Sequence, residues 1–468
     1  MKSKTKARLL FCSVLATSGV VFAQQNIYSQ TPKVVIPENR KDLQPVYEFA
    51  HGPAPSSVAV TDNGRIFVSF PCSRETSETQ SQNGSDNLTQ NGYHCGLAEL
   101  KYTNGDTTGG HLESYPNLEI NRYDADHPQD HFIDVRAIRA EGNHLWVLDA
   151  AAPENGTFIS GGAKLISINL ATNQIDRTIS IPERVARQGC CLDQMRLDTR
   201  AGTSGVAFIS DSSPSGHSAI IVVDLATGNA WRRLRDTVSV QPDPQFTLSA
   251  EGQQLTWSGP QAQQASAVEP PNNAPAQNTQ SQSQSNQPVR IGVEGLAVSN
   301  DGTTLYYAPL CSNRLYSIDT GVLFKHDDRA DQTANQDMNN DNGKANDEDR
   351  EAIRTEVNSA VHDCGDKGFP TSSMEFDDQG NLYMTDVQNG AIRERESDGT
   401  YTAVMQDPRI DWPSSLCLAT DNDLHEHFMY FVSTQYDRKP MFHNGDDQRT
   451  KPIYMFRFLV NNGPGANP

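Results

Sequence analysis

EGLAVSNDGTTLYYAP (residues 294–309) is a short apolar strand, a turn closed by Gly302, and a second apolar strand rich in aromatic residues. A hairpin of this kind cannot bury both of its apolar faces, so several copies must stack. The same phrase recurs as SSVAVTDNGRIFVSF (56–70), DVRAIRAEGNHLWVLD (134–149), QMRLDTRAGTSGVAFISD (194–211), SSMEFDDQGNLYMTD (372–386) and SSLCLATDNDLHEHFMYFVST (414–434). Six hairpins with almost no helical periodicity between them predict an all-β fold, a six-bladed β-propeller.

The segments that follow the hairpins fit the outer strands of four-stranded blades. AKLISINLAT (163–172), AIIVVDLATGNAWRRL (219–234) and NRLYSIDTGVL (313–323) alternate apolar and polar residues and end in turn residues. We expect PIYMFRFLV (452–460) to pair with a strand near residues 33–36, because this pairing would close the ring and remove an exposed edge. One propeller domain is therefore expected over residues 24–468.

The N-terminus has the pattern of a secretory signal peptide, residues 1–23. Four cationic side chains lie within residues 2–8, an apolar run covers 9–21, and Val-Phe-Ala at 21–23 supplies a cleavage site. The run is short for a membrane span, and no second one follows. The sequence predicts a secreted protein, extracellular or periplasmic, that does not reside in a membrane.

Three polar insertions interrupt the propeller pattern, at about 73–92, 259–289 and 326–352, and their composition predicts flexible loops. Within the third, Asp337-x-Asn339-x-Asp341 resembles the start of an EF-hand loop. That loop requires Gly at its sixth position, where this chain has Asn342. We therefore expect a solvated acidic loop, and neither a metal nor another cofactor.

The formal net charge of −20 bears on the class of partner. Nucleic acid and anionic membranes are bound through Lys and Arg, so an acidic surface disfavours both. A small molecule remains as the expected partner, and the sequence gives no oligomeric state.

Seven cysteines remain once Cys12 leaves with the signal peptide. In an oxidising compartment some of them are expected to pair. Cys72 and Cys95 bracket the first insertion and would staple it. Cys190 and Cys191 would form a vicinal disulfide or pair with different partners, and the odd count leaves at least one thiol unpaired.

One register position of the repeat predicts a ligand site. The residue eight places before the turn residue opens the inner strand of each blade and is polar in every copy, and inner strands surround one axis. A polar residue beside a loop also has a plain structural explanation, and the two interpretations stay open. The ring consists of Ser56, Asp134, Gln194, Glu294, Ser372 and Ser415.

The second strands end close to the same face with three acidic residues, Asp149, Asp211 and Asp386. They extend the candidate ligand-binding set, although an Asp at a strand end often only accepts hydrogen bonds from turn amides. For a reaction, Asp134 or Glu294 would serve as general base. Arg136 lies two residues beyond Asp134 on the same strand face and would stabilise developing negative charge.

The order of the motifs resembles the Yellow and major royal jelly protein family. The pieces that carry the resemblance are LWVLDA (145–150), KLISINLATNQI (164–175), SGVAFISDSS (204–213), GVEGLAVSNDGTTLYYAPLCSNRLYSIDTGVL (292–323) and GDKGFPTSSMEFDDQGNLYMTDVQNGAI (365–392). The resemblance implies a secreted six-bladed propeller that binds a small aromatic or amine-bearing ligand at one end of its axis. Some members of the family are implicated in dopachrome conversion and others are carriers, so catalysis stays open.

The chain also resembles in fold the gluconolactonase and senescence-marker-protein group, whose members hold calcium with Glu, two Asn and Asp. By motif position those ligands would fall at Ser56, near Gln194, at Glu294 and at Pro309. None is retained, and Ser and Pro are poor ligands for a hard cation. The expected functions are therefore, in order, a binding protein, an isomerase of the dopachrome-converting kind, and a metal-dependent lactonase or esterase.

Overall fold

The computed structural model describes residues 42–74, 89–90, 93–102, 110–153, 158–213, 217–235, 237–258, 287–325, 343–421 and 425–460. They all lie in one compact unit, Ile36–Pro468. The expected signal peptide (1–23) lies outside the described residues, as do 75–88, 259–286 and 326–342, the larger parts of the three expected insertions.

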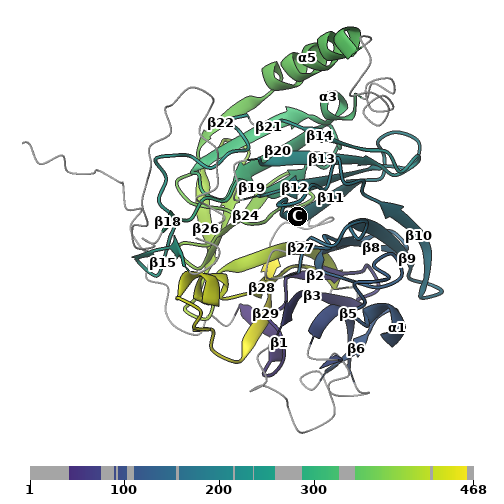
Figure 1. The fold of residues 1–468 in the computed structure, drawn as a ribbon. Coiled ribbons are helices and arrows are strands. Elements are labelled where there is room, and N and C mark those ends of the chain that lie inside the picture. The colour runs from purple at the N-terminus through teal and green to yellow at the C-terminus, as the bar shows by residue number, and fades with distance from the viewer. Residues whose placement is uncertain are drawn as a thin grey trace, which may run out of the picture. The chain divides into compact units, whose positions relative to one another are not determined.

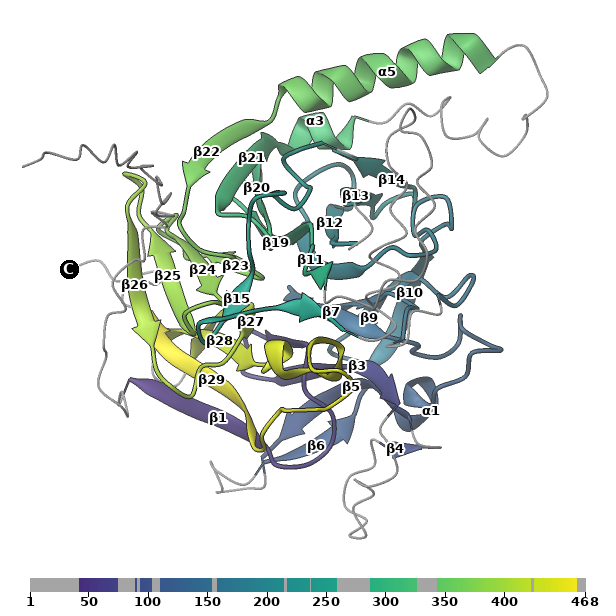
Figure 2. The ribbon, with the colours of Figure 1, turned by 60° about the vertical axis from the view of Figure 1, so that its left-hand side comes forward.

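Six antiparallel sheets surround one axis, as the repeated hairpins predicted (Figure 1, Figure 2). Blade 1 contains β2 (Ser57–Val60), β3 (Ile66–Arg74) and β5 (Tyr93–Lys101), with β4 (Thr89–Gln90) and β6 (His111–Ser114) both paired to β5. Blade 2 contains β7 (Val135–Glu141), β8 (His144–Asp149), β9 (Lys164–Asn169) and β10 (Gln174–Ser180). Blade 3 contains β11 (Leu192–Asp198), β12 (Val206–Asp211), β13 (Ala219–Asp224) and β14 (Ala230–Arg233).

The second half of the ring repeats this pattern. Blade 4 contains β19 (Val293–Val298), β20 (Thr304–Pro309), β21 (Arg314–Asp319) and β22 (His362–Asp366). Blade 5 contains β23 (Met374–Phe376), β24 (Leu382–Asp386), β25 (Ala391–Arg395) and β26 (Tyr401–Gln406). Blade 6 contains β27 (Pro413–Asp421), β28 (Glu426–Ser433), β29 (Ile453–Val460) and β1 (Leu43–Phe49).

The first strands of the blades form a closed inner ring. In the order β2, β7, β11, β19, β23 and β27 each strand contacts the next, and β27 contacts β2. The turn glycines of the repeat, Gly64, Gly142, Gly202, Gly302 and Gly380, all have positive φ, a conformation that glycine adopts without strain. Apolar residues of neighbouring blades pack face to face, as in the buried cluster that joins blades 2 and 3.

The ring closes through the expected C-terminal strand but with a different partner. β29 pairs with β1, from Leu43↔Phe458 to Phe49↔Ile453. The prediction of a partner near residues 33–36, which lie outside the described residues, was therefore wrong. A four-residue strand would leave half of the eight-residue β29 uncovered, whereas β1 covers most of it.

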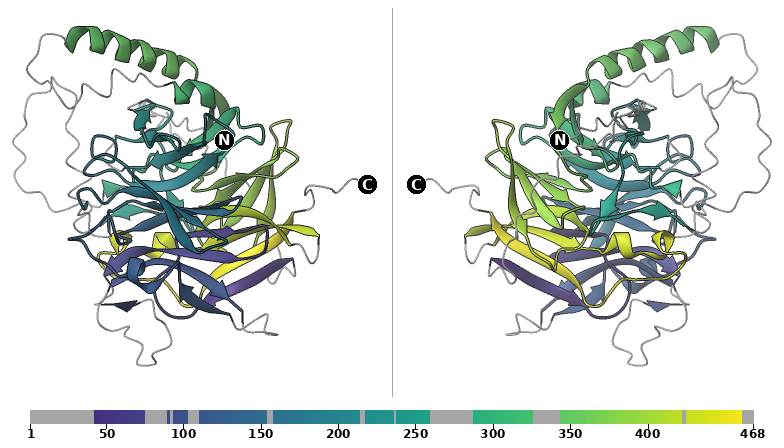
Figure 3. Two further views of the ribbon diagram at one scale, coloured as in Figure 1. Left: turned by 90° about the vertical axis from the view of Figure 1, so that its right-hand side faces the viewer. Right: turned by 90° about the vertical axis from the view of Figure 1, so that its left-hand side faces the viewer.

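The third insertion also differs from the expected loop, because its C-terminal part is the helix α5 (Gly343–Ser359). Ile353 and Val357 of α5 pack against the apolar cluster of blades 3 and 4, beside α3 (Thr320–Phe324), at the rim of the ring (Figure 3). The smaller elements are α1 (Leu118–Asn121), β15 (Ser249–Ala250), β16 (Gln253–Gln254), β17 (Thr256–Trp257), β18 (Gln287–Pro288), η2 (Tyr436–Arg438) and η3 (Pro440–Phe442). Across the described ranges no helix has the length and apolarity needed to cross a membrane.

The cysteines differ in part from expectation. Cys190 and Cys191 are both free thiols, so neither expected pairing is present, and Cys311, Cys364 and Cys417 are free as well. Cys72 is disulfide-bonded. The side chain of Cys95 lies outside the described residues, so the Cys72–Cys95 pairing stays a prediction.

Candidate functional site

The inner strands of blades 2, 3, 4 and 6 each carry a register shift in their first residues. Pairing skips Arg136 in β7, Asp193 and Gln194 in β11, Glu294 in β19, and Ser415 and Leu416 in β27. A bulge re-aims the side chain of the extra residue. Arg136, Asp193 and Glu294 are partly exposed although their strand neighbours are buried.

The charges of these bulge residues change one another's pKa values. Burial raises the pKa of Glu294 well above its ordinary value, the negative charge of Asp193 raises it further, and Arg136 opposes both effects. Burial likewise raises the pKa of Asp193, again against Arg136. The charges of Arg136 and Asp193 also change the pKa values of Tyr436 and Cys191. We call this group, Arg136, Cys191, Asp193, Glu294 and Tyr436, the axial cluster.

Arg136 is held in place by Asp134. The fully buried Asp134 carboxylate accepts from the Cys72 N–H at 2.9 Å with Oδ1, and from Arg136 Nε at 2.7 Å with Oδ2. Burial raises the pKa of Asp134, and Arg136 opposes this. The buried Asp134 therefore holds the guanidinium group of Arg136 in position.

The two carboxyl groups of the axial cluster have few partners. Asp193 Oδ2 accepts one long hydrogen bond, 3.3 Å, from Gln194 Nε2. The main-chain N–H of Gln194 donates to Ser210 Oγ instead. Within the described part of the chain the Glu294 carboxyl has no hydrogen-bond or ion-pair partner. Loss of solvation thus favours the protonated form of Glu294 more than it would in a fully exposed Glu.

Tyr436 adds an aromatic group from the turn that follows β28. Its ring lies 5.4 Å from that of Trp412 and 5.6 Å from that of Phe442, and Lys439 Nζ lies 4.7 Å from its centroid. Burial, Cys191 and Glu294 raise the pKa of the hydroxyl well above its ordinary value, so it stays protonated. The cluster thus combines a cation, two acidic groups, a thiol and a phenol.

A second polar layer confirms that opposite blades meet at the axis. Arg139 Nη1 of blade 2 donates to Glu375 Oε2 of blade 5 at 2.7 Å and to the Leu416 carbonyl of blade 6 at 3.1 Å. Arg196 of blade 3 donates to the Met374 carbonyl. Blades 2 and 5 are three steps apart in a ring of six, so this ion pair spans the axis.

The serines of the expected polar ring join neighbouring blades. Ser56 Oγ contacts Ser69 Oγ at 2.9 Å and donates to the Val135 carbonyl at 3.3 Å. Ser372 Oγ donates to the Pro413 carbonyl at 3.0 Å, and Ser415 Oγ lies 2.8 Å from Ser57 Oγ. Their hydroxyls bridge blades 1 and 2, 5 and 6, and 6 and 1, and these contacts favour the structural interpretation of the three serines.

The three strand-end aspartates are buried within their own blades. Asp149 accepts from the N–H groups of Ile133, Asp134 and Ala151, and pairs with Lys164 Nζ at 2.7 Å. Asp211 pairs with Arg232 at 2.6 Å and Asp386 with Arg393 at 2.7 Å, and both also accept from loop N–H groups. Each of these carboxylates is held by a cation of its own blade, and Asp211 also accepts from the N–H of Cys191, at the edge of the axial cluster, at 2.9 Å.

Sequence reasoning missed Asp193 and Tyr436. Asp193 is adjacent to the predicted Gln194, and the count was displaced because the β11 bulge adds residues before regular pairing begins at Met195. Tyr436 lies in a 3-10 turn outside the repeat. An acidic residue beside the counted position in QGCCLDQM was the available signal for Asp193, and the sequence offered none for Tyr436.

A cavity of about 320 Å³ lies elsewhere, between blades 2 and 3. It is lined by Glu141 at the end of β7, whereas Arg136 lies at the start of that strand, so the cavity and the axial cluster are separate. The shifted pKa values of the axial carboxyls mark the axis as the candidate site for the main function. Among the described residues no group of three or more His, Cys, Asp or Glu side chains is arranged to hold a metal ion.

The comparisons with known proteins agree with the motif resemblance. A family model described as major royal jelly protein matches residues 140–348. Major royal jelly protein 1 of Apis mellifera is 24% identical over 242 residues, which cover 50% of this chain and 46% of that protein. The match thus spans about half the length of this relative. The resemblance to the major royal jelly protein family is confirmed.

Solved structures of similar fold cover most of the chain at low identity. A calcium-binding protein, regucalcin, from Agrobacterium tumefaciens is 11% identical with a TM-score of 0.45 and covers 90% of this chain and 95% of that chain. A luciferin-regenerating enzyme is 9% identical with a TM-score of 0.44 and the same coverage. A gluconolactonase from Xanthomonas campestris is 9% identical with a TM-score of 0.41, covering 91% and 97%.

Proposed function

We propose, from the resemblance to the major royal jelly protein family and from the axial cluster, that this chain binds a small organic molecule carrying an amine and an aromatic ring. The observation that carries the proposal is the Glu294 carboxyl, which lacks a partner among the described residues and lies near Asp193 at the ring axis. A site with convergent polar groups and shifted pKa values is a natural ligand site.

The charges of the cluster favour an ammonium group. Arg136 is paired with Asp134, and Lys439 offsets part of the charge of Asp193. Glu294 feels the charge of Arg136 but has no ion-pair partner of its own among the described residues. A bound ammonium would stabilise the ionised form and lower the pKa of Glu294, so binding near neutral pH releases a proton.

The aromatic ring of the ligand would contact Tyr436. Contacts with the rings of Trp412 and Phe442 restrict the motion of this side chain, which limits the entropy lost when a ligand packs on it. The hydroxyl group of Tyr436 is protonated and supplies a hydrogen-bond donor.

Calorimetry with tyramine and 4-ethylphenol tests the proposal, because the two probes differ mainly in the amine. The chain should bind tyramine more tightly, with proton release that appears as a dependence of the heat on the ionisation enthalpy of the buffer. Glu294→Gln should weaken tyramine about tenfold or more and leave 4-ethylphenol nearly unchanged.

Glu113→Gln is the matched control, since Glu113 is an exposed carboxylate of blade 1. It should leave both affinities unchanged. Equal affinity for tyramine and 4-ethylphenol, or equal losses in both variants, would contradict the proposal.

A second candidate, an isomerase of the dopachrome-converting kind, is favoured by two carboxyl groups with raised pKa values, Asp193 and Glu294, that both interact with the charge of Arg136. Asp193 would accept a proton from carbon, Glu294 would return one, and Arg136 would stabilise the intermediate charge. The test is loss of dopachrome colour catalysed by the chain and abolished in Glu294→Gln. Binding without turnover supports the carrier function instead.

Secretion belongs to the proposal as well. Its support is the basic residues and apolar run of segment 1–23. Expression of the full chain should yield a mature protein that begins near Gln24, outside the cytoplasm, as N-terminal sequencing would show. Recovery of an uncleaved cytoplasmic chain would contradict it.

A further inference from the structure

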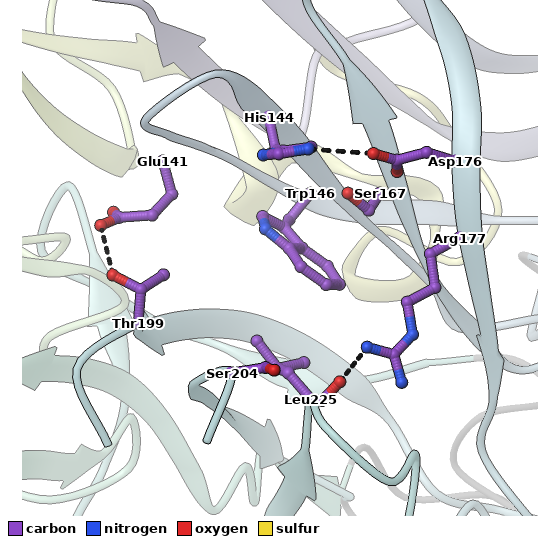
Figure 4. Close-up of a pocket in the computed structure, with 9 residues that line it drawn as sticks. All are labelled: Glu141, His144, Trp146, Ser167, Asp176, Arg177, Thr199, Ser204 and Leu225. Atoms are coloured by element: carbon purple, nitrogen blue, oxygen red, sulfur yellow. Dashed lines mark hydrogen bonds and ion pairs between the residues drawn. The ribbon is translucent and has the colours of Figure 1, made fainter. Parts of the chain in front are cut away.

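The cavity between blades 2 and 3 has a lining that the axial site does not use. Trp146 of β8, Ser167 of β9 and Arg177 of β10 are direct cross-strand partners, with Trp146↔Ser167 and Ser167↔Arg177. Cross-strand partners share one face of a sheet. This row faces blade 3, which contributes Thr199, Ser204 and Leu225. Figure 4 shows Trp146 between Glu141 and Thr199 on one side and Ser167 and Arg177 on the other.

Two polar groups of this lining have no hydrogen-bond partner within the protein and open onto the cavity. Trp146 is 8% exposed and Ser167 is 3% exposed. In the part of the chain that the structure describes, neither the indole N–H of Trp146 nor the hydroxyl of Ser167 makes a hydrogen bond to another residue. Both side chains line the cavity, so these two groups are available to form hydrogen bonds with a molecule that enters it.

The charged groups at the rim are already partnered. Glu141 accepts from Thr199 Oγ1 at 3.1 Å, and His144 Nε2 lies 2.9 Å from Asp176 Oδ2. Arg177 donates to the Leu225 carbonyl and, at 3.0 Å, to the Ala226 carbonyl. An anion would face two carboxylates, and a cation would face Arg177. The lining therefore favours a neutral ligand rich in both donors and acceptors.

The size and the aromatic wall narrow the ligand class. About 320 Å³ is near the lower limit for small-molecule sites, enough for one six-membered ring with its substituents. The Trp146 ring offers an apolar face, and its N–H, Ser167 and the rim carboxylates offer polar partners. We propose that the cavity between blades 2 and 3 binds a single neutral sugar ring, a hexose, packed on Trp146.

The test is titration of the full chain with glucose, galactose and mannose, each followed by tryptophan fluorescence and calorimetry. At least one should bind saturably with a millimolar Kd and change the fluorescence. Trp146→Phe and Ser167→Ala should each weaken binding about tenfold or more, because each removes a group that would form a hydrogen bond with the bound sugar.

Two control variants separate this site from the rest of the molecule. Trp231→Phe alters a buried tryptophan that donates to the Leu323 carbonyl and should leave sugar affinity unchanged. Glu294→Gln should also leave it unchanged, so failure of the axial proposal and failure of this one are distinguishable. Ser167→Ala replaces a small hydroxyl and keeps the test usable if Trp146→Phe fails to fold.

Three results would overturn the proposal. The first is that none of the three sugars binds the wild-type chain. The second is that Trp146→Phe and Ser167→Ala bind the sugar as the wild type does. The third is that tetramethylammonium or phosphate, tested as charged probes, binds this cavity more tightly than the sugars.

Discussion

Acidic side chains in two regions of this propeller differ in exposure and in their partners: the strand-end group is buried, and the axial group is partly exposed. At the strand ends, Asp149, Asp211 and Asp386 each have a Lys or Arg partner within 2.7 Å and accept further hydrogen bonds from loop N–H groups. At the axis, Glu294 has no described partner, and Asp193 has one long hydrogen bond. Burial alone therefore does not mark a functional carboxyl. We therefore propose Glu294 as the functional carboxyl because it is partly exposed, lacks a described partner and has a raised pKa.

The largest effect should come from breaking a strand-end pair. Asp149→Asn leaves Lys164, which is fully buried, without its anion, and we expect a loss of about 3 kcal/mol or more in the free energy of unfolding. Urea unfolding measures it. A Lys164→Met change added to Asp149→Asn should recover part of the loss. A loss of less than about 1 kcal/mol in the single variant would contradict a structural role for the Asp149–Lys164 pair.

A carboxyl-to-amide change at the axis should affect ligand binding and leave stability almost unchanged. Glu294→Gln removes a carboxyl that has no stabilising partner, so unfolding should change by less than about 1 kcal/mol while the response to tyramine is lost. Thermal shift with and without tyramine measures both quantities. A variant that fails to fold would place Glu294 with the structural carboxylates.

The axial carboxyls should also give stability a distinctive pH dependence. The pKa of Glu294 is raised above its unfolded value, so between the ordinary pKa of Glu and the folded pKa the folded state binds the proton and the unfolded state does not. Stability from this group is therefore present at low pH and lost as pH rises through the folded pKa. Urea midpoints from about pH 5 to about pH 8 should fall less steeply in Glu294→Gln than in the wild type. Equal slopes would contradict this.

A small loss of stability, with no effect on ligand binding, should come from the hydroxyl groups that join neighbouring blades. Ser372→Ala removes hydrogen bonds to Thr385 and to the Pro413 carbonyl, at an expected loss of about 1 kcal/mol. Tyramine binding should not change, because Ser372 lies outside the axial cluster. A selective loss of binding in this variant would return Ser372 to the ligand site.

The fold could be predicted from the sequence because each blade contains a hairpin, with a characteristic apolar pattern and turn, that can be recognised locally. Two non-local features were missed. The partner of β29 depends on length matching between strands at opposite ends of the chain. The helix α5 has only a few apolar residues among many charged ones, so its periodicity is weak, and its packing on blades 3 and 4 decides its position.

The candidate site was only partly accessible. Counting from the turn residue located Glu294 and pointed to Arg136 beside Asp134, because β7 and β19 each skip a single residue. It chose Gln194 over Asp193, because β11 skips two. The sugar-sized cavity depends on the packing of two blades, which no local pattern encodes.

Carbon-detected NMR titration of the Glu294 carboxyl, in the wild type and in Asp193→Asn, tests the central claim most directly. If distant strands bring the two carboxyls together at the axis, Glu294 should titrate well above the usual pKa of Glu, and its pKa should fall when Asp193 loses its charge. A Glu294 that titrates at its ordinary value and does not respond to Asp193→Asn would contradict the account.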